Sequence, residues 1–128
     1  MIEKIQALDL SYLEGRIVKE GKISRENVGN AIRRYKNFLS LMIKYPGQII
    51  VPTADIDEVW HNHILHTREY MHDCKTIFKK YQHHTPFHGH DDKNAQEKMS
   101  QWYYKTAELY IEEFQESYAL ELDVATFW

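Results

Sequence analysis

The stretch DIDEVWHNHILHTREYMHDC, residues 55–74, places its apolar side chains at the three- and four-residue spacing of an α-helix. With about 3.6 residues per turn, side chains at this spacing share one face of a helix. Most of one face is apolar or aromatic, around a single histidine: Ile56, Val59, Trp60, His63, Thr67, Tyr70, Met71 and Cys74. Acidic residues at the start of the stretch favour the positive end of a helix dipole. The pattern therefore predicts an amphipathic helix over about 54–79.

The same spacing on both sides of this stretch predicts three further helices, over about 2–20, 24–45 and 92–117. Gly21 is a suitable end for the first helix, and Ser24 and Asp92 are suitable N-caps for the other two. QIIVP at 48–52 is β-branched, but no partner strand lies nearby, so we expect an extended connector. The prediction is an all-α fold, a single-domain bundle of about four helices over residues 1–128.

Composition excludes several classes of protein. The chain has 43% hydrophobic and 27% charged residues, a globular balance, and no apolar run long enough for a membrane span. Its net charge is -3 and its lysines and arginines are scattered, which argues against binding of duplex nucleic acid. The N-terminus lacks the pattern of a secretory signal, and Cys74 is the only cysteine. We expect a soluble, cytoplasmic protein.

Histidines concentrate in a functional segment from about 55 to 92. In a helix, His63 lies in the centre of the apolar face, whereas Asp57 and His61 share a second face one turn apart. His61 and His63 then point in nearly opposite directions, so a regular helix does not present both rings to the same ion. His63 and His66, three residues apart, could bind one ion together. A loop before the last helix adds further histidines and acids: His83, His84, His88, His90, Asp91 and Asp92.

Neutral imidazole binds transition metals, often with carboxylate, and a helix face closed by a loop can supply three or four ligands. We therefore predict a zinc or iron site drawn from six candidate ligands: Asp57, His61, His63, His83, His84 and His90. An ion with an open coordination position would activate water for hydrolysis, or engage oxygen if it is iron. The spacing matches no fixed metal motif such as H-E-x-x-H.

Each of these features also has a structural explanation. A histidine in an apolar stripe is more often a core residue that bonds a neighbour than a ligand. The pairing of Asp57 with His61 is equally compatible with a surface ion pair. Trp60 and Cys74 fit a core, as does the aromatic stripe from Trp102 to Phe114.

The residues from 55 to 89 also resemble a known family. The run DIDEVWHNHILHTREYMHDC, followed by HHTPFHG, is similar to the small proteins related to the glycine-rich domain-containing proteins, whose domain has no assigned function. The pattern joins an Asp-x-x-Trp-His core to a downstream Thr, Tyr and Cys and to a His-His-x-Pro turn: Asp57, Trp60, His61, Thr67, Tyr70, Cys74, His83, His84 and Pro86. The resemblance covers roughly 50–90, with a weaker echo in ELYIEEF at 108–114.

This resemblance implies a helical domain of unassigned activity, and plant members that carry it beside other modules are linked to regulation. It does not imply a metal. The chain departs from the pattern at Phe78–Lys79, where the family has Phe-Gly before the histidine pair. Without a glycine at the C-cap, we expect the helix to continue past this point.

Three functions follow from the sequence. The first is a metal-binding helical protein with His61, His83 and His84 as leading ligands. The alternative is a non-catalytic interaction or regulatory module with structural histidines. Its partner is a protein or a second copy of the chain, and its contact surface is aromatic: Trp60, Phe87, Phe127 and Trp128. The third is metal-free acid–base catalysis by Asp57 and His61, because histidine titrates near neutral pH.

Overall fold

A computed structural model describes residues 2–85 and 91–119, and these residues are helical with no strand. The elements in chain order are α1 (Ile2–Gln6), the 3-10 turn η1 (Ser11–Leu13), α2 (Glu14–Glu20), α3 (Arg25–Lys44), α4 (Ala54–Leu65), α5 (Thr67–Ile77) and α6 (Lys93–Phe114). The all-α prediction is confirmed. None of the described helices is both long enough and apolar enough to cross a membrane.

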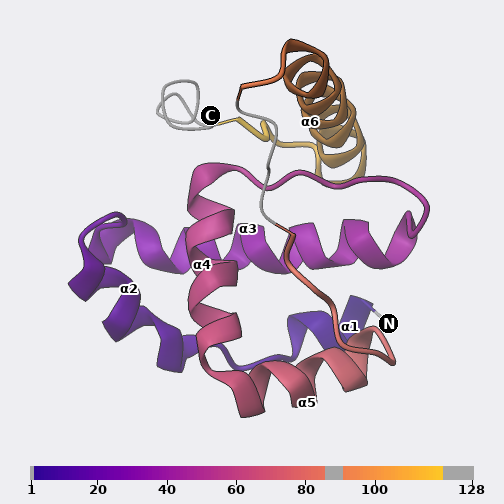
Figure 1. Ribbon diagram of the computed structural model, residues 1–128. Helices are drawn as coiled ribbons and strands as arrows, with labels where there is room; N and C mark the ends of the chain where they lie inside the picture. The colour runs from indigo at the N-terminus through magenta and orange to yellow at the C-terminus, as the bar shows by residue number, and fades with distance from the viewer. Residues whose placement is uncertain (1, 86–90, 120–128) are drawn as a thin grey trace.

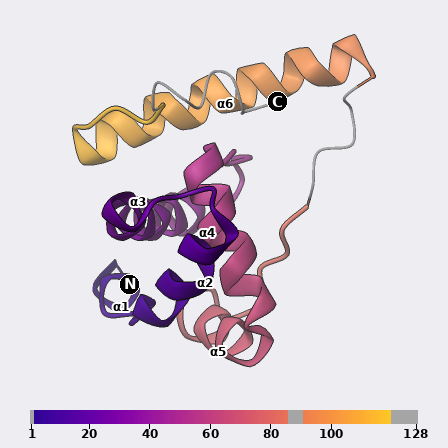
Figure 2. The same cartoon turned by 90° about the vertical axis from the view of Figure 1, so that its left-hand side faces the viewer.

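The helix α3 lies at the centre of the fold. It is crossed by α4, and the short helices α1 and α2 and the helix α5 pack around this pair (Figure 1). Figure 2 shows α6 lying across the top of the other helices. The buried side chains of α6 all come from its second half: Thr106, Leu109 and Tyr110. The first half of α6 therefore contributes no buried residue to the core.

The described residues form six α-helices where four were predicted, because two predicted helices are interrupted. The first is broken after Gln6, where the side chain of Asp9 accepts hydrogen bonds from the N–H and the hydroxyl of Ser11, at 3.1 and 2.7 Å. Such short-range bonds compete with helical hydrogen bonding and start a new turn.

The second interruption lies at His66, between α4 and α5. Its ring Nδ1 donates to the main-chain oxygen of Asn62 at 2.9 Å, and its N–H bonds His63 O instead, at 3.1 Å. In a continuous helix that N–H would bond the carbonyl of Asn62. The side chain thus takes the place of the main-chain donor, and the backbone at His66 turns to φ -87° and ψ 72°. This exchange of hydrogen-bond donors divides the predicted 54–79 helix.

The predicted helix boundaries are partly confirmed. Gly21 ends α2 in a left-handed conformation with φ 84°, and the Asp92 carboxylate caps α6 by accepting from the N–H groups of Asn94 and Ala95. Ser24 occupies the N-cap position of α3, but its side chain makes no capping bond. The stretch 48–52 contains no strand, as predicted.

The predicted continuation of the central helix past Phe78 is wrong. The helix α5 ends at Ile77, and Lys79 takes the left-handed conformation with φ 64° that glycine usually supplies at a helix end. A side chain strains this conformation, so tertiary contacts of the following residues must hold it.

One hydrophobic core joins the helices, and it contains most of the predicted face of α4 and α5, although Thr67 and Met71 of that face are exposed. Ile56, Val59 and Trp60 are almost fully buried, as are Tyr70 and Cys74. They pack in one cluster with the inward side of α3, including Tyr35 and Phe38. The expectation that Trp60 and Cys74 are core residues is confirmed.

A buried arginine connects three parts of the fold. Arg34 on α3 is 1% exposed, and its guanidinium donates to both carboxylate oxygens of Asp55 at 2.8 and 3.3 Å. It also donates to Thr53 Oγ1 and to the main-chain oxygens of Ser117 and Tyr118. The network joins α3 to the start of α4 and to the segment after α6. No local pattern in the sequence predicts this network.

Candidate functional site

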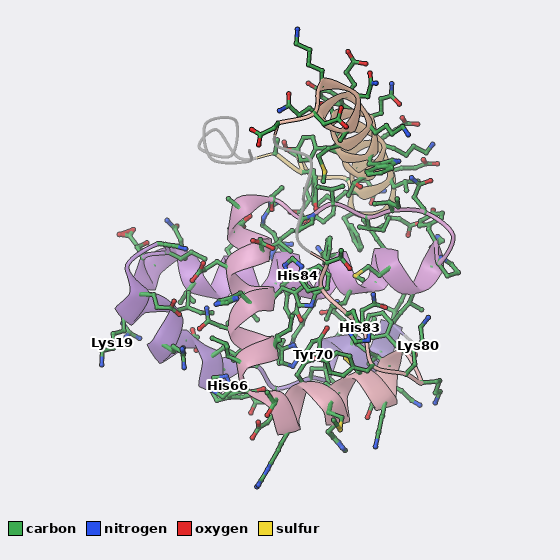
Figure 3. All side chains as sticks on the ribbon, viewed as in Figure 1. Lys19, His66, Tyr70, Lys80, His83 and His84 are labelled. Carbon is green, nitrogen blue, oxygen red and sulfur yellow. The ribbon has the colours of Figure 1, made fainter. Side chains whose placement is uncertain are left out.

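The centre of the candidate site is a cluster of Asp57, Trp60 and His84. Asp57 and Trp60 lie three residues apart on α4, and His84 comes from the extended segment 81–85. The Nε2–H of His84 donates to Asp57 Oδ1 at 2.6 Å, and its ring stacks on Trp60 with 4.1 Å between centroids and 17° between planes. Figure 3 shows His84 above Tyr70 in this region. The carboxylate and the indole together fix the imidazole.

Tyr70 attaches the same segment to α5. Its hydroxyl accepts from Trp60 Nε1 at 2.9 Å and donates to the main-chain oxygen of Gln82. Burial raises the pKa of Tyr70, so the phenol stays protonated and available as a donor. Burial likewise raises the pKa of the Cys74 thiol, which disfavours the thiolate that a metal would require.

His63 is enclosed between two protein partners. Its Nε2–H donates to Asp73 Oδ2 at 2.9 Å, and its Nδ1 therefore accepts from the Tyr35 hydroxyl at 2.7 Å. Burial lowers the pKa of His63, and the opposing effect of the neighbouring Asp73 carboxylate is smaller, so the net shift is downward. The neutral ring links α3, α4 and α5, and both of its nitrogens are used. Neither nitrogen is free for an ion, and His66 Nδ1 is occupied by Asn62.

The other candidate histidines lie at the surface. His61 is exposed on α4 and has no hydrogen bond within the described residues, and Asp57 bonds His84 in place of the expected His61. His83 is exposed and contacts the edge of Tyr81 with 4.8 Å between ring centroids. Within residues 2–85 and 91–119, no three His, Cys, Asp or Glu side chains are grouped to hold a metal ion. His90 lies outside the described residues, as do His88, Pro86, Phe87, Phe127 and Trp128.

A groove of about 670 Å³ opens beside the His84–Trp60 stack. Its walls come from the end of α3, the connector 46–52, the segment 77–85 and the first half of α6. Apolar residues dominate these walls: Met42, Ile43, Ile49, Ile50, Val51, Trp60, Ile77, Phe78, Met99 and Trp102. The volume is within the range of about 300–1,000 Å³ that is typical of preformed binding pockets.

Among the described residues, the formally charged side chains that line this groove are both basic. Lys79 and Lys80 line it together with His83 and His84, and no aspartate or glutamate of residues 2–85 and 91–119 is among the lining residues. Both lysines are exposed and neither forms an ion pair within the described part of the chain. The chain as a whole carries 19 acids against 16 bases, so this local balance departs from the average.

Sequence reasoning missed two parts of this arrangement. Asp73 was not selected, although it lies ten residues after His63, which is about three helical turns away on a continuous helix. The break at His66 brings the two side chains together, and nothing in the spacing signals it. The groove was also missed, because its walls come from parts of the chain that are distant in the sequence: 42–52, 60, 77–85 and 99–102.

These features define a class: a small all-helical protein in which an Asp–His–Trp cluster fastens an extended segment beside an apolar groove. The chain belongs to the UCP032817-like family, whose model matches residues 8–120. This is a domain family of unknown function. No curated protein and no solved structure matches the chain.

Proposed function

We propose that this chain is a non-catalytic interaction module with structural histidines, and that the groove beside the His84–Trp60 stack is its contact surface. The observation that carries the proposal is the apolar groove of about 670 Å³, which the described residues line with two lysines and no acid. Isoleucine, methionine and tryptophan side chains in such a groove suit the core of a protein–protein contact.

The histidine contacts support a structural role for three rings. His63 bonds Tyr35 and Asp73, His66 bonds the main chain of Asn62, and His84 bonds Asp57. A general base must be able to approach a substrate proton, and the buried ring of His63 has no such access. The expected acid–base pair of Asp57 and His61 has a different geometry here, because the carboxylate contacts His84.

A matched pair of variants tests the interaction surface. Ile49 lines the groove and is 49% exposed, whereas Ile111 lies on α6 outside it and is 50% exposed. A partner captured on the immobilised wild-type protein from native lysate should be lost with Ile49→Glu and kept with Ile111→Glu. Both variants should unfold at temperatures close to that of the wild type, because surface changes usually have small effects.

Two results count against this proposal. Equal retention of the partner by both variants would place the contact surface elsewhere. A large fall in unfolding temperature on treatment with a chelator would show that the histidines hold an ion, since removal of a bound metal removes its contribution to stability.

A second candidate, metal binding, is favoured by one specific contact. The Nε2–H of His84 donates to Asp57 Oδ1 at 2.6 Å, which leaves Nδ1 as the ring nitrogen able to bind zinc or iron, and a carboxylate often orients a metal-bound histidine in this way. We propose His84 as a ligand of any such ion, with Asp57 orienting its ring and with His61, His83 and His90 as the candidates for further positions. An ion with an open position would support hydrolysis, or oxygen chemistry if it is iron.

Elemental analysis of protein purified without an affinity tag tests the metal proposal. We expect stoichiometric zinc or iron in the wild type, its loss in His84→Ala, and its retention in His72→Ala, which removes an exposed histidine outside the candidate set. Wild-type protein that contains no stoichiometric metal would end this candidate and leave the interaction module.

We also propose a relationship to the glycine-rich domain-containing proteins. The support is that positions of that pattern, though separated in sequence, contact one another here: Asp57 bonds His84, His84 stacks on Trp60, and Trp60 bonds Tyr70. A glycine at the left-handed position of Lys79 is also what that pattern contains. A structure of such a protein tests the proposal: it should show the same bond between aspartate and histidine, and its absence would contradict the relationship.

A further inference from the structure

We propose that the groove binds an extended segment of a partner protein in which apolar side chains are flanked by acidic ones. This inference rests on the interaction function proposed above and names the chemistry of the partner. Three features of the groove carry it: the sign of the charges at its border, the conformation of the chain in its walls, and the exposure of its apolar residues.

The border of the groove is suited to carboxylates. Lys79 and Lys80 provide two ammonium groups, His83 lies in the same segment, and the part of the chain that the structure describes adds no acidic side chain to the lining. Figure 3 shows Lys80 and His83 close together on the side opposite Lys19. A carboxylate that approaches these groups meets no repulsion from the lining, and complementary charge fixes the orientation and register of a partner.

Two extended stretches of main chain form walls of the groove. Residues 49–52 and 81–85 have no regular secondary structure, and neither stretch makes a main-chain to main-chain hydrogen bond within the described residues. The main chain of Val51 bonds side chains instead. Its N–H donates to Thr106 Oγ1, and its carbonyl accepts from the Tyr118 hydroxyl. The main-chain groups of Ile50 and His84 have no protein partner in the described part of the chain.

Extended main chain of this kind is what a bound peptide uses when it adds a strand to a protein edge. In such a complex the peptide main chain supplies affinity, while alternate side chains enter pockets and supply specificity. A small amphipathic anion such as a fatty acid would satisfy the lysines and the apolar wall, but it would leave these main-chain donors unpaired. The structure therefore favours a peptide over a lipid.

Apolar contacts are available without rearrangement of the core. Ile49 is 49% exposed at the groove, and Met99 and Trp102 face the same space from α6, both partly buried. An apolar residue of the partner that covers Ile49 removes its surface from water, which is the main source of affinity in such contacts. The buried Trp60 forms part of the groove beside His84 and is already held by Tyr70.

Selection from a library of random nonapeptides displayed on phage tests the inference on the full-length protein. We expect the enriched peptides to contain at least two apolar residues and a net negative charge. The best of these, labelled with fluorescein, should bind about tenfold more weakly to the variant Lys79→Glu, Lys80→Glu than to the wild type. Its affinity should also fall between about 0.1 M and about 1 M salt, because added salt screens exposed charge pairs.

Matched controls separate the groove from general charge and folding effects. The variant Lys4→Glu, Lys19→Glu makes the same charge change away from the groove and should bind like the wild type. Binding should also be lost with Ile49→Glu and kept with Ile111→Glu. N-methylation of alternate peptide amides removes main-chain donors and should weaken binding at least tenfold, whereas it would not affect a lipid-like mode.

The outcomes distinguish this inference from the proposed function. Enriched peptides that are basic or uncharged, with binding still lost in Ile49→Glu, overturn the acidic partner but leave the groove as the contact surface. Binding of dodecanoate to the groove, without enrichment of any peptide, overturns the peptide. Peptides that bind all the groove variants as well as the wild type overturn both the inference and the proposed surface.

Discussion

The contact between Tyr35 and His63 offers a direct test of whether the histidines are structural. Replacement of Tyr35 by phenylalanine removes a single hydroxyl and keeps the ring, which is 0% exposed. That hydroxyl donates to His63 Nδ1 at 2.7 Å, and His63 is 1% exposed. In the variant the acceptor stays buried and loses its donor.

The magnitude follows from the burial of that acceptor. A buried polar atom left without a partner costs about 1–3 kcal/mol, so we expect Tyr35→Phe to lower the free energy of unfolding by about 2 kcal/mol. For a chain of this size, that corresponds to a fall in Tm of about 8 °C. The double variant Tyr35→Phe, His63→Leu removes both polar groups, so the two effects should not add, with a coupling energy of about 1–2 kcal/mol.

Urea unfolding followed by circular dichroism measures these free energies, with an unchanged m-value as the check that the unfolded state is comparable. Tyr104→Phe is the control, because Tyr104 is 71% exposed and its change should stay within about 0.5 kcal/mol. If Tyr35→Phe is as mild as Tyr104→Phe, His63 does not depend on Tyr35. Its nitrogen would then be free for another ligand, and the structural role argued above would be refuted.

Three further predictions concern stability. Arg34→Gln should lower the free energy of unfolding by about 3 kcal/mol, since it leaves Asp55 without its buried partner; a urea midpoint close to that of the wild type would contradict this role. Lys79→Gly should raise stability by about 1 kcal/mol, because φ 64° is strained for lysine and free for glycine; thermal unfolding measures it, and a lower Tm would show that the lysine side chain compensates for the strain. Burial lowers the pKa of His63 below its unfolded value of 6.5, so below that pH the unfolded chain binds more protons than the folded chain. The contribution of His63 to the free energy of unfolding should be fully present above about pH 6.5 and should be lost as the pH falls through the pKa of the folded state. Urea unfolding over a pH series measures this loss, and it should be smaller in His63→Leu.

The helices could be predicted because each depends on a local signal. These signals act over one or two helical turns: the apolar spacing within α3 and α6, the Asp92 carboxylate that caps α6, and the glycine at position 21 that ends α2. The break at His66 was missed because it depends on one side chain that takes a main-chain bond from its own helix. Periodicity does not detect such an exchange, since the apolar face continues across it.

The site could be predicted in its location but not in its contacts. Composition and resemblance both selected the segment that contains Asp57, Trp60 and His84, and the structure brings these three together. Local spacing suggested His61 as the partner of Asp57, yet the bonded ring comes from 27 residues along the chain. Arg34 likewise follows the polar pattern of a helix surface, and it is buried only because Asp55 and the segment after α6 meet it. Contacts of this range depend on the tertiary fold.

The uneven attachment of α6 makes the two sides of the groove mechanically different. The first half of this helix contributes Met99 and Trp102 to the groove but no buried residue to the core, whereas the opposite side is fastened by Tyr70 and Asp57. Fraying of that half would expose little apolar surface and so would require little free energy. A bulky ligand would therefore be accommodated by displacement of the first half of α6, while the segment held by Tyr70 and Asp57 keeps its position.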